Sequence, residues 1–144
     1  GYYDLRTWLG YLIKGDELDL PDEELNPAVF KNKSSIRALA DSSAYAFINI
    51  LRGETSFGTI MDSLGYACVP SINDLGPAGL RYFSGGYITA RYGSRDGGIV
   101  SAIQVELPQP GIRDTEENWS RYASAFATAV DAYYGHHLGR NMQP

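Results

Sequence analysis

Glu106 is the residue of this sequence best suited to chemistry. It is the only charged residue in the run from Ile99 to Leu107 (Ile-Val-Ser-Ala-Ile-Gln-Val-Glu-Leu). Burying an unpaired carboxylate is costly, so such a residue is usually paired, close to a metal ion, or placed at a strand end facing a cleft. A carboxylate in that position suits general acid/base catalysis, because it can take a proton from an attacking water molecule. Glu106 is therefore the candidate catalytic residue.

Three arginines, Arg81, Arg91 and Arg95, lie close to this run in the sequence. An arginine can hold a substrate carboxylate through two parallel hydrogen bonds. Arg81 and Arg91 are therefore candidate substrate-binding residues. The alternative is a structural pair between Glu106 and one of these arginines, which would brace the surrounding strands.

Other catalytic arrangements are poorly represented. Neither Gly-Gly pair continues into the Gly-Lys-Ser/Thr of a phosphate-binding loop. His136 and His137 are adjacent, so on a helix they point about 100° apart and do not both reach one zinc ion. Cys68 is the only cysteine, which excludes an internal disulfide and leaves a buried thiol or an interchain disulfide. We therefore assign no metal ligand to this chain.

Composition narrows the class of protein. The 144 residues suit one domain, and a hydrophobic content of 44% indicates a folded chain. A net charge of −5 with scattered Lys and Arg argues against nucleic-acid binding. No apolar run approaches the roughly 20 residues that span a bilayer, so no membrane partner is expected. Two Asn-x-Ser sequons, at Asn32 and Asn118, would matter only in a secretory compartment, so an extracellular location depends on their use.

Two short strands are expected to position Glu106. They cover Tyr87 to Arg91 and Ile99 to Leu107, with the turn-rich segment 93–98 between them. The second is nearly continuous in apolar character, which is typical of a strand covered on both faces. Pro108 and Pro110 end it.

Helices are expected around these strands. The spacing of Leu5, Trp8, Leu9 and Leu12 predicts a first helix, and the acidic segment 16–26 predicts a solvated loop or helix start. Further helices are predicted over residues 36–40, with Ser34 or Ser35 as N-cap, and over 44–52, with Ser42 or Ser43 as N-cap. Another is predicted over 57–64, with Thr55 or Ser56 as N-cap. The last helix is predicted from Asp114 or Thr115 to Gly135, and residues 136–144 are predicted to form a flexible tail.

The summed pattern predicts an α/β fold, with a mixed sheet flanked by helices. Two or three strands are few for a chain of this length. We therefore expect residues 1–144 to form the C-terminal portion of one domain, completed by an N-terminal segment or a second chain.

Four short motifs follow one another along the chain. They are Arg52-Gly53-x-x-Ser56-Phe57-Gly58, Gly65-Tyr66-x-x-Val69-Pro70-Ser71, Tyr82-Phe83-x-Gly85-Gly86-Tyr87-Ile88-Thr89 and Ala102-Ile103-Gln104-Val105-Glu106-Leu107. In this order, over roughly residues 34–134, they resemble the C-terminal half of the N-formylglutamate amidohydrolase family.

The resemblance implies a zinc-exopeptidase-like fold and hydrolysis of an N-acyl amide on a small acidic amino acid, with a zinc-bound water as nucleophile. Glu106 matches the glutamate of the Ile-Gln-x-Glu motif, the general acid/base. Thr89 matches the threonine of the Gly-Gly-Tyr-Ile-Thr motif, close to the substrate. The zinc ligands of the family lie in histidine motifs that this chain does not contain. Zinc is therefore expected in the intact assembly, held by a second chain that carries the N-terminal half.

The chain departs from the family pattern at its arginines. The family places an arginine directly after the threonine, where this chain has Ala90. Arg91 follows, but neighbouring strand residues face opposite ways. Arg81 lies one residue further from the Gly-Gly pair than a family arginine does. These departures favour the alternative of a non-catalytic binding or structural protein that retains the fold. A self-sufficient, monomeric domain is a third interpretation.

Overall fold

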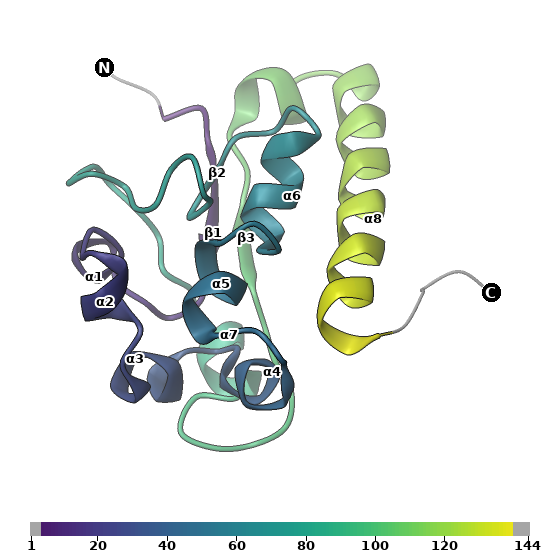
Figure 1. The fold of residues 1–144 in the computed structure, drawn as a ribbon. Helices are drawn as coiled ribbons and strands as arrows, with labels where there is room; N and C mark the ends of the chain where they lie inside the picture. Colours follow the sequence, from purple (N-terminus) through teal and green to yellow (C-terminus); the bar gives the residue numbers. More distant parts are fainter. Residues whose placement is uncertain (1–3, 140–144) are drawn as a thin grey trace.

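A three-stranded mixed sheet lies at the centre of the fold (Figure 1). This computed structural model describes residues 4–139. The strands are β1 (Thr7–Gly10), β2 (Cys68–Val69) and β3 (Gln104–Glu106), in the order β2-β1-β3. β1 runs parallel to β2 and antiparallel to β3, and Trp8 lies opposite Glu106. The predicted mixed α/β class, with a sheet flanked by helices, is confirmed.

The first predicted helix, over Leu5 to Leu12, is wrong, because Thr7–Gly10 form the central strand β1. Thr7, Leu9 and Tyr11 are buried on one face of the sheet, while Trp8 on the other face is only half-buried. This alternation has the two-residue period of a strand. Leu5, Trp8, Leu9 and Leu12 fit the helical period, whereas Leu9, Tyr11 and Ile13 are two residues apart and fit the strand period. Pairing with strands far away in the sequence therefore decides the conformation.

The strand predicted over Tyr87 to Arg91 is also wrong, because these residues lie in helix α7 (Tyr87–Tyr92). Its first turn is closed by a hydrogen bond from the Ala90 amide to the Gly86 carbonyl, at 3.0 Å. Tyr87 and Ile88 are exposed, and Thr89 is the buried residue of the helix. The apolar side chains that suggested a strand therefore face solvent.

The second predicted strand is confirmed only in part. Gln104–Glu106 pair with β1, and Glu106 ends the strand as expected. Ile99 and Val100 are 92% and 59% exposed, so the run is not covered on both faces. The segment before β3 is held elsewhere: the Ala102 amide donates to the Ser35 carbonyl at 3.1 Å, and the Ser35 hydroxyl donates to the Ala102 carbonyl at 2.6 Å.

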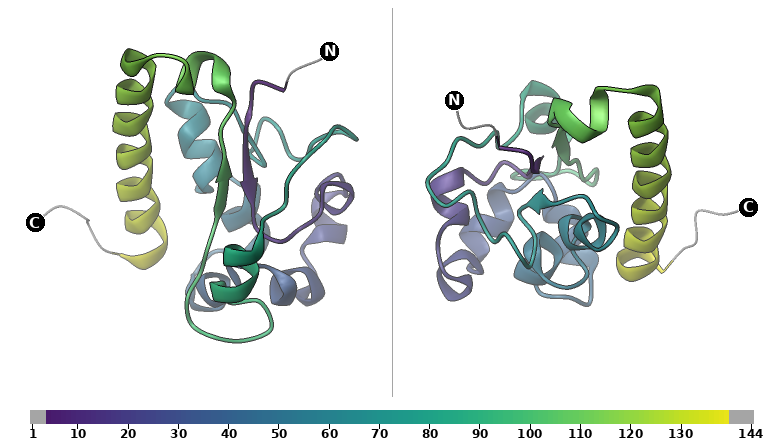
Figure 2. Two further views of the ribbon diagram at one scale, coloured as in Figure 1. Left: turned by 180° about the vertical axis from the view of Figure 1, so that it is seen from behind. Right: turned by 90° about the horizontal axis from the view of Figure 1, so that it is seen from above.

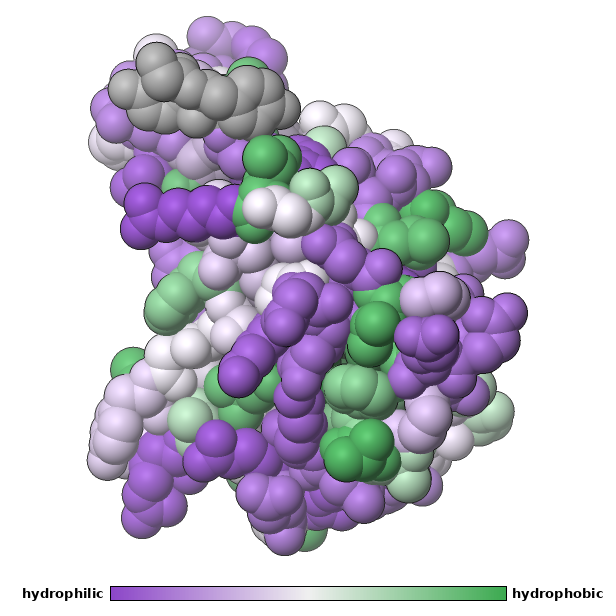
Figure 3. Space-filling view, turned by 90° about the vertical axis from the view of Figure 1, so that its left-hand side faces the viewer, coloured by the Kyte–Doolittle hydropathy of each residue, from purple (hydrophilic) through white to green (hydrophobic). Residues whose placement is uncertain are grey.

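The acidic segment forms short helices on the surface. These are α1 (Gly15–Leu18) and α2 (Asp22–Leu25), followed by α3 (Ala28–Lys33). Leu18 and Leu25 are fully buried, whereas most of the acidic side chains around them are exposed. The side of the molecule on which these helices lie is largely hydrophilic, with separate apolar areas (Figure 3).

The remaining helices follow local capping signals where these exist. They are α4 (Arg37–Ser42), α5 (Phe47–Arg52), α6 (Phe57–Ser63) and α8 (Glu116–Leu138), with a π-turn at η1 (Gln109–Arg113). Ser56 accepts from the Thr59 amide and Thr115 from the Asn118 amide, which confirms both as N-caps. Helices α4 and α5 begin after Ile36 and Ala46, without a side-chain cap, so the serine caps predicted for them are wrong.

The predicted stop at Gly135 is wrong as well, because α8 continues to Leu138. Gly139 follows in the left-handed conformation, with φ of 61°, which glycine adopts without strain. His136 and His137 are therefore helical. Residues 140–144 of the predicted tail lie outside the described residues.

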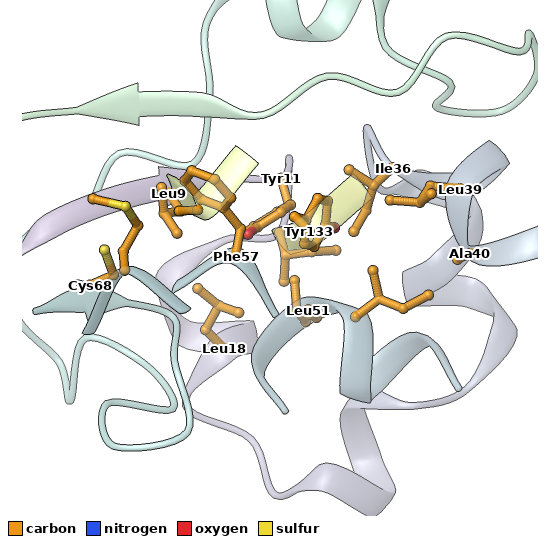
Figure 4. Packing of buried hydrophobic residues seen from close by; sticks show 14 of the residues in the cluster. Leu9, Tyr11, Leu18, Ile36, Leu39, Ala40, Leu51, Phe57, Cys68 and Tyr133 are labelled. Atoms are coloured by element: carbon orange, nitrogen blue, oxygen red, sulfur yellow. The ribbon is translucent and has the colours of Figure 1, made fainter. Parts of the chain in front are cut away.

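The core lies between one face of the sheet and the helices α5, α6 and α8. Leu9 from β1, Tyr11 just after this strand, Phe57 from α6 and Tyr133 from α8 converge there (Figure 4). The Phe57 ring contacts those of Phe126 and Tyr133 edge-on, with centroids 5.3 and 5.8 Å away. Each fully buried large apolar side chain contributes about 1.5–3 kcal/mol, so this layer dominates the stability of the fold.

Within residues 4–139, no helix is long and apolar enough to cross a membrane.

Candidate functional site

Glu106 lies on the sheet face opposite to the core. It is the last residue of β3, it is half-buried, and Trp8 of β1 lies directly across from it. Residues opposite each other in an antiparallel pair share a face of the sheet. The indole of Trp8 is therefore an apolar neighbour of this carboxylate.

Two hydrogen bonds connect Glu106 to Thr89. The Thr89 hydroxyl donates to Gln104 Oε1 at 3.1 Å, and Gln104 Nε2 donates to Glu106 Oε1 at 3.0 Å. Gln104 and Glu106 are two residues apart on β3 and so point to the same face. Thr89 is 3% exposed and projects from α7. The structure thus brings together two of the predicted site residues, with Gln104 as a link that residue-type reasoning missed.

The second carboxylate oxygen of Glu106 is left available. Among the described residues, Oε2 accepts no hydrogen bond, whereas Oε1 is held by Gln104. A carboxylate fixed through one oxygen and open at the other has the arrangement that a general acid/base requires.

The segment 80–86 covers part of this face and leads into α7. The Leu12 amide donates to the Ser84 carbonyl at 2.8 Å, and the Tyr82 hydroxyl donates to the Leu9 carbonyl. Gly10 makes this close approach possible, because a Cβ there would lie 2.6 Å from the Ser84 carbonyl oxygen. Gly10 thus has a packing role beside the site.

An ion-pair network orients Trp8 next to Glu106. The Asp4 carboxylate accepts from Trp8 Nε1 at 3.0 Å and from Arg6 Nε at 2.9 Å, and Arg6 Nη1 reaches Asp74 at 2.8 Å. Burial opposes ionisation of Asp4, but the hydrogen bonds from Arg6 and Trp8 outweigh it and lower the pKa of Asp4 to about 2. The hydrogen bond to Asp4 raises the pKa of Arg6 in turn. This network was not predicted from the sequence.

The predicted arginines do not pair with Glu106. Arg81 and Arg91 are exposed, and the Arg91 guanidinium lies 5.6 Å from the centre of the Tyr92 ring. Arg95 forms a long ion pair with Asp96, at 3.8 Å. In the described part of the chain no ion pair joins Glu106 to any cation within 4.0 Å. No ion pair in the described residues therefore supports the alternative of a structural pair between Glu106 and an arginine.

The residues present do not fit a zinc site. Between residues 4 and 139, no three His, Cys, Asp or Glu side chains gather closely enough to hold a metal ion. His137 is buried, with Nε2 2.8 Å from the Thr55 carbonyl oxygen, and serves packing. Cys68 is fully buried in β2, and burial raises the pKa of its thiol to about 12. Such a thiol is neither a ready metal ligand nor a nucleophile.

Comparison with known proteins yields no relative: no family model, curated protein sequence or solved structure matches this chain.

Proposed function

We propose that this chain contributes Glu106 as the general acid/base of a hydrolase that cleaves an N-acyl amide on an acidic amino acid. The hydrogen-bonded series Thr89–Gln104–Glu106 carries this proposal. It joins residues of the two motifs on which the resemblance to the N-formylglutamate amidohydrolases depends most.

The chain's own residues account for the proton transfers. Gln104 fixes Oε1 of Glu106, and Oε2 accepts a proton from the attacking water and returns it to the leaving nitrogen. Trp8 limits access of bulk water on one side. Thr89 is buried and donates to Gln104, so it positions this series beside the substrate through Gln104. A positioned acid/base of this kind contributes about 10²- to 10⁴-fold in rate.

The metal that such a hydrolase uses must be held by ligands outside residues 4–139. A second polypeptide that carries the ligands is therefore part of the proposal. Arg81 and Arg91 remain candidates for the substrate carboxylate, since both are exposed and free of ion pairs within the described residues.

Metal analysis of the protein isolated from its natural source, together with hydrolysis of N-formyl-L-glutamate before and after chelation, tests the proposal. We expect one zinc for each copy of this chain, and a rate that chelation abolishes and zinc restores. A metal-free assembly that does not hydrolyse the substrate would contradict it.

A non-catalytic binding protein is the second candidate. It is favoured by a hollow of about 450 Å³ on the opposite face of the sheet, which apolar side chains line for the most part. Ala90, in the position after Thr89 where the family places an arginine, points the same way. The metal-free outcome described above would support this candidate.

A further inference from the structure

The outer edge of β3 is open. In the described part of the chain β3 pairs with β1 alone. Seen from behind, β3 runs in front of β1 (Figure 2, left). An edge strand of this kind presents a row of unpaired backbone N–H and C=O groups, which can pair with a strand of another chain.

Helix α8 carries a second apolar stripe that does not face the core. Its first stripe packs on α6 and includes Tyr122, Ala129 and Tyr133. The second, which we call the groove stripe, consists of Trp119, Ala123, Ala127, Tyr134 and Leu138, while Val130, which also packs against the core, lies between the two stripes. None of these side chains is charged, and Trp119 is 56% exposed. Two apolar stripes on one helix are typical of a helix that packs against two surfaces.

A groove joins the open edge to this stripe. The hollow of about 450 Å³ is lined by Ile99, Val100, Ile103 and Val105 on one side and by the C-terminal half of α8 on the other. Two shallower hollows continue past Leu107 and Ile112 to Trp119, along the N-terminal half of the helix. An apolar groove therefore follows α8 along most of its length.

We propose that this groove and the edge of β3 form the interface between two copies of this chain. The two segments 99–107, which contain β3, pair antiparallel about a two-fold axis, so that the sheets join, and the two groove stripes pack against each other. The proposal does not depend on the proposed function, because Glu106 points to the other face of the sheet.

The surface is self-complementary, which favours a second copy over another partner. A two-fold axis places strand edge against strand edge and helix against helix. With the axis at Ile103, Ile99 of one copy faces Leu107 of the other. The groove stripe contains no charge, and Glu106, the one charged residue of the segment 99–107, lies opposite Val100 of the other copy, so like charges do not face each other in the paired segments. The two α8 helices run antiparallel, so that their dipoles point in opposite directions.

The area agrees with a specific dimer. Helix α8 has 23 residues and is therefore roughly 35 Å long. With a width of one helix and one strand, roughly 15 Å, the surface measures on the order of 500 Å² in each copy. A total of about 1,000 Å² reaches the lower limit for a specific interface.

Analytical ultracentrifugation over a concentration series tests the proposal with a matched pair of variants. Ala127→Arg places a cation in the middle of the groove stripe, where it meets its own symmetry mate. Thr128→Arg places the same cation about 100° further round α8, at an exposed position outside the groove stripe. We expect wild type and Thr128→Arg to sediment at twice 15.8 kDa, and Ala127→Arg to associate at least about tenfold more weakly.

A second variant tests the strand edge. Ile99 is 92% exposed, so Ile99→Lys leaves the fold of each copy intact and weakens the dimer through the edge. Circular dichroism checks that all variants are folded. A wild-type protein that remains at 15.8 kDa at every concentration, or dimers that neither Ala127→Arg nor Ile99→Lys weakens, would overturn the proposal.

Discussion

The guanidinium of Arg52 lies where several segments of the chain meet. It is 1% exposed and donates to the carbonyls of Leu18, Leu20 and Leu75, at 2.5, 2.8 and 3.1 Å. It also binds the Asp22 carboxylate through Nε and Nη2, at 2.9 and 2.6 Å. Because Asp22 is exposed, the three carbonyls depend on Arg52 more than the carboxylate does.

Replacing Arg52 by alanine should destabilise the fold strongly. The buried carbonyl of Leu18 and the partly buried carbonyls of Leu20 and Leu75 would lose their donor, so we expect a loss of about 3–5 kcal/mol in the free energy of unfolding, measured by urea denaturation. Arg121→Ala is the control, because Arg121 pairs with Glu117 on the exposed side of α8 and its loss should change stability little. Equal effects of the two substitutions would contradict this role of Arg52.

Residue types indicated part of the site. Glu106 was predicted at a strand end and lies there, and Thr89 was associated with it by motif alone. Gln104, the link between them, could not be predicted, because its contact with Thr89 depends on residues 87–92 being helical. Likewise, only the tertiary structure shows that Arg52, at the end of its helix, is buried.

At the scale of elements, helix caps made within one turn could be predicted from the sequence, whereas contacts between distant segments could not. Ser56 and Thr115 cap their helices through hydrogen bonds within one turn, so the sequence predicted both. The strand β1 and the helix α7 were assigned the wrong structure, because their apolar residues fit more than one period. The strands that contain Cys68 and Glu106 pair with β1 and so fix its extended conformation. In α7, the helical conformation comes with a hydrogen bond from the buried Thr89 to Gln104.

His137 connects the C-terminal end of α8 to the rest of the fold, and its titration makes the free energy of unfolding depend on pH. Its Nε2 lies 2.8 Å from the Thr55 carbonyl oxygen and its Nδ1 3.4 Å from the Ser43 hydroxyl. Burial, with a smaller contribution from His136, lowers the pKa of His137 below its ordinary value of 6.5. The unfolded chain therefore binds a proton at a higher pH than the folded chain does.

The stabilisation that neutral His137 provides should thus be complete above pH 6.5 and decline as the pH falls through its lowered pKa. Thermal unfolding between neutral and mildly acidic pH measures this decline. His137→Gln should flatten the profile in this range, whereas His136→Gln, at an exposed position, should leave its shape unchanged. Parallel profiles for wild type and His137→Gln would contradict the assignment.

On the scale of the whole molecule, the candidate site and the groove beside α8 lie on opposite faces of the sheet. One carries Glu106, Gln104 and Trp8 beneath the segment 80–86, and the other carries the core and the groove beside α8. The α/β class and the small number of strands followed from the sequence. The open edge and the second stripe of α8 could not be inferred, because exposure of Ile99 and Trp119 depends on how α8 packs.

The most direct test of the account is the rate of N-formyl-L-glutamate hydrolysis by the zinc-loaded assembly with Glu106→Gln. This variant keeps the size of the side chain and the contact with Gln104 but removes proton transfer. We expect kcat to fall by about 10²- to 10⁴-fold, with unchanged zinc content and thermal stability, while Glu54→Gln, an exposed control, retains the wild-type rate. A full rate in Glu106→Gln would contradict the central claim that Glu106 is the general acid/base.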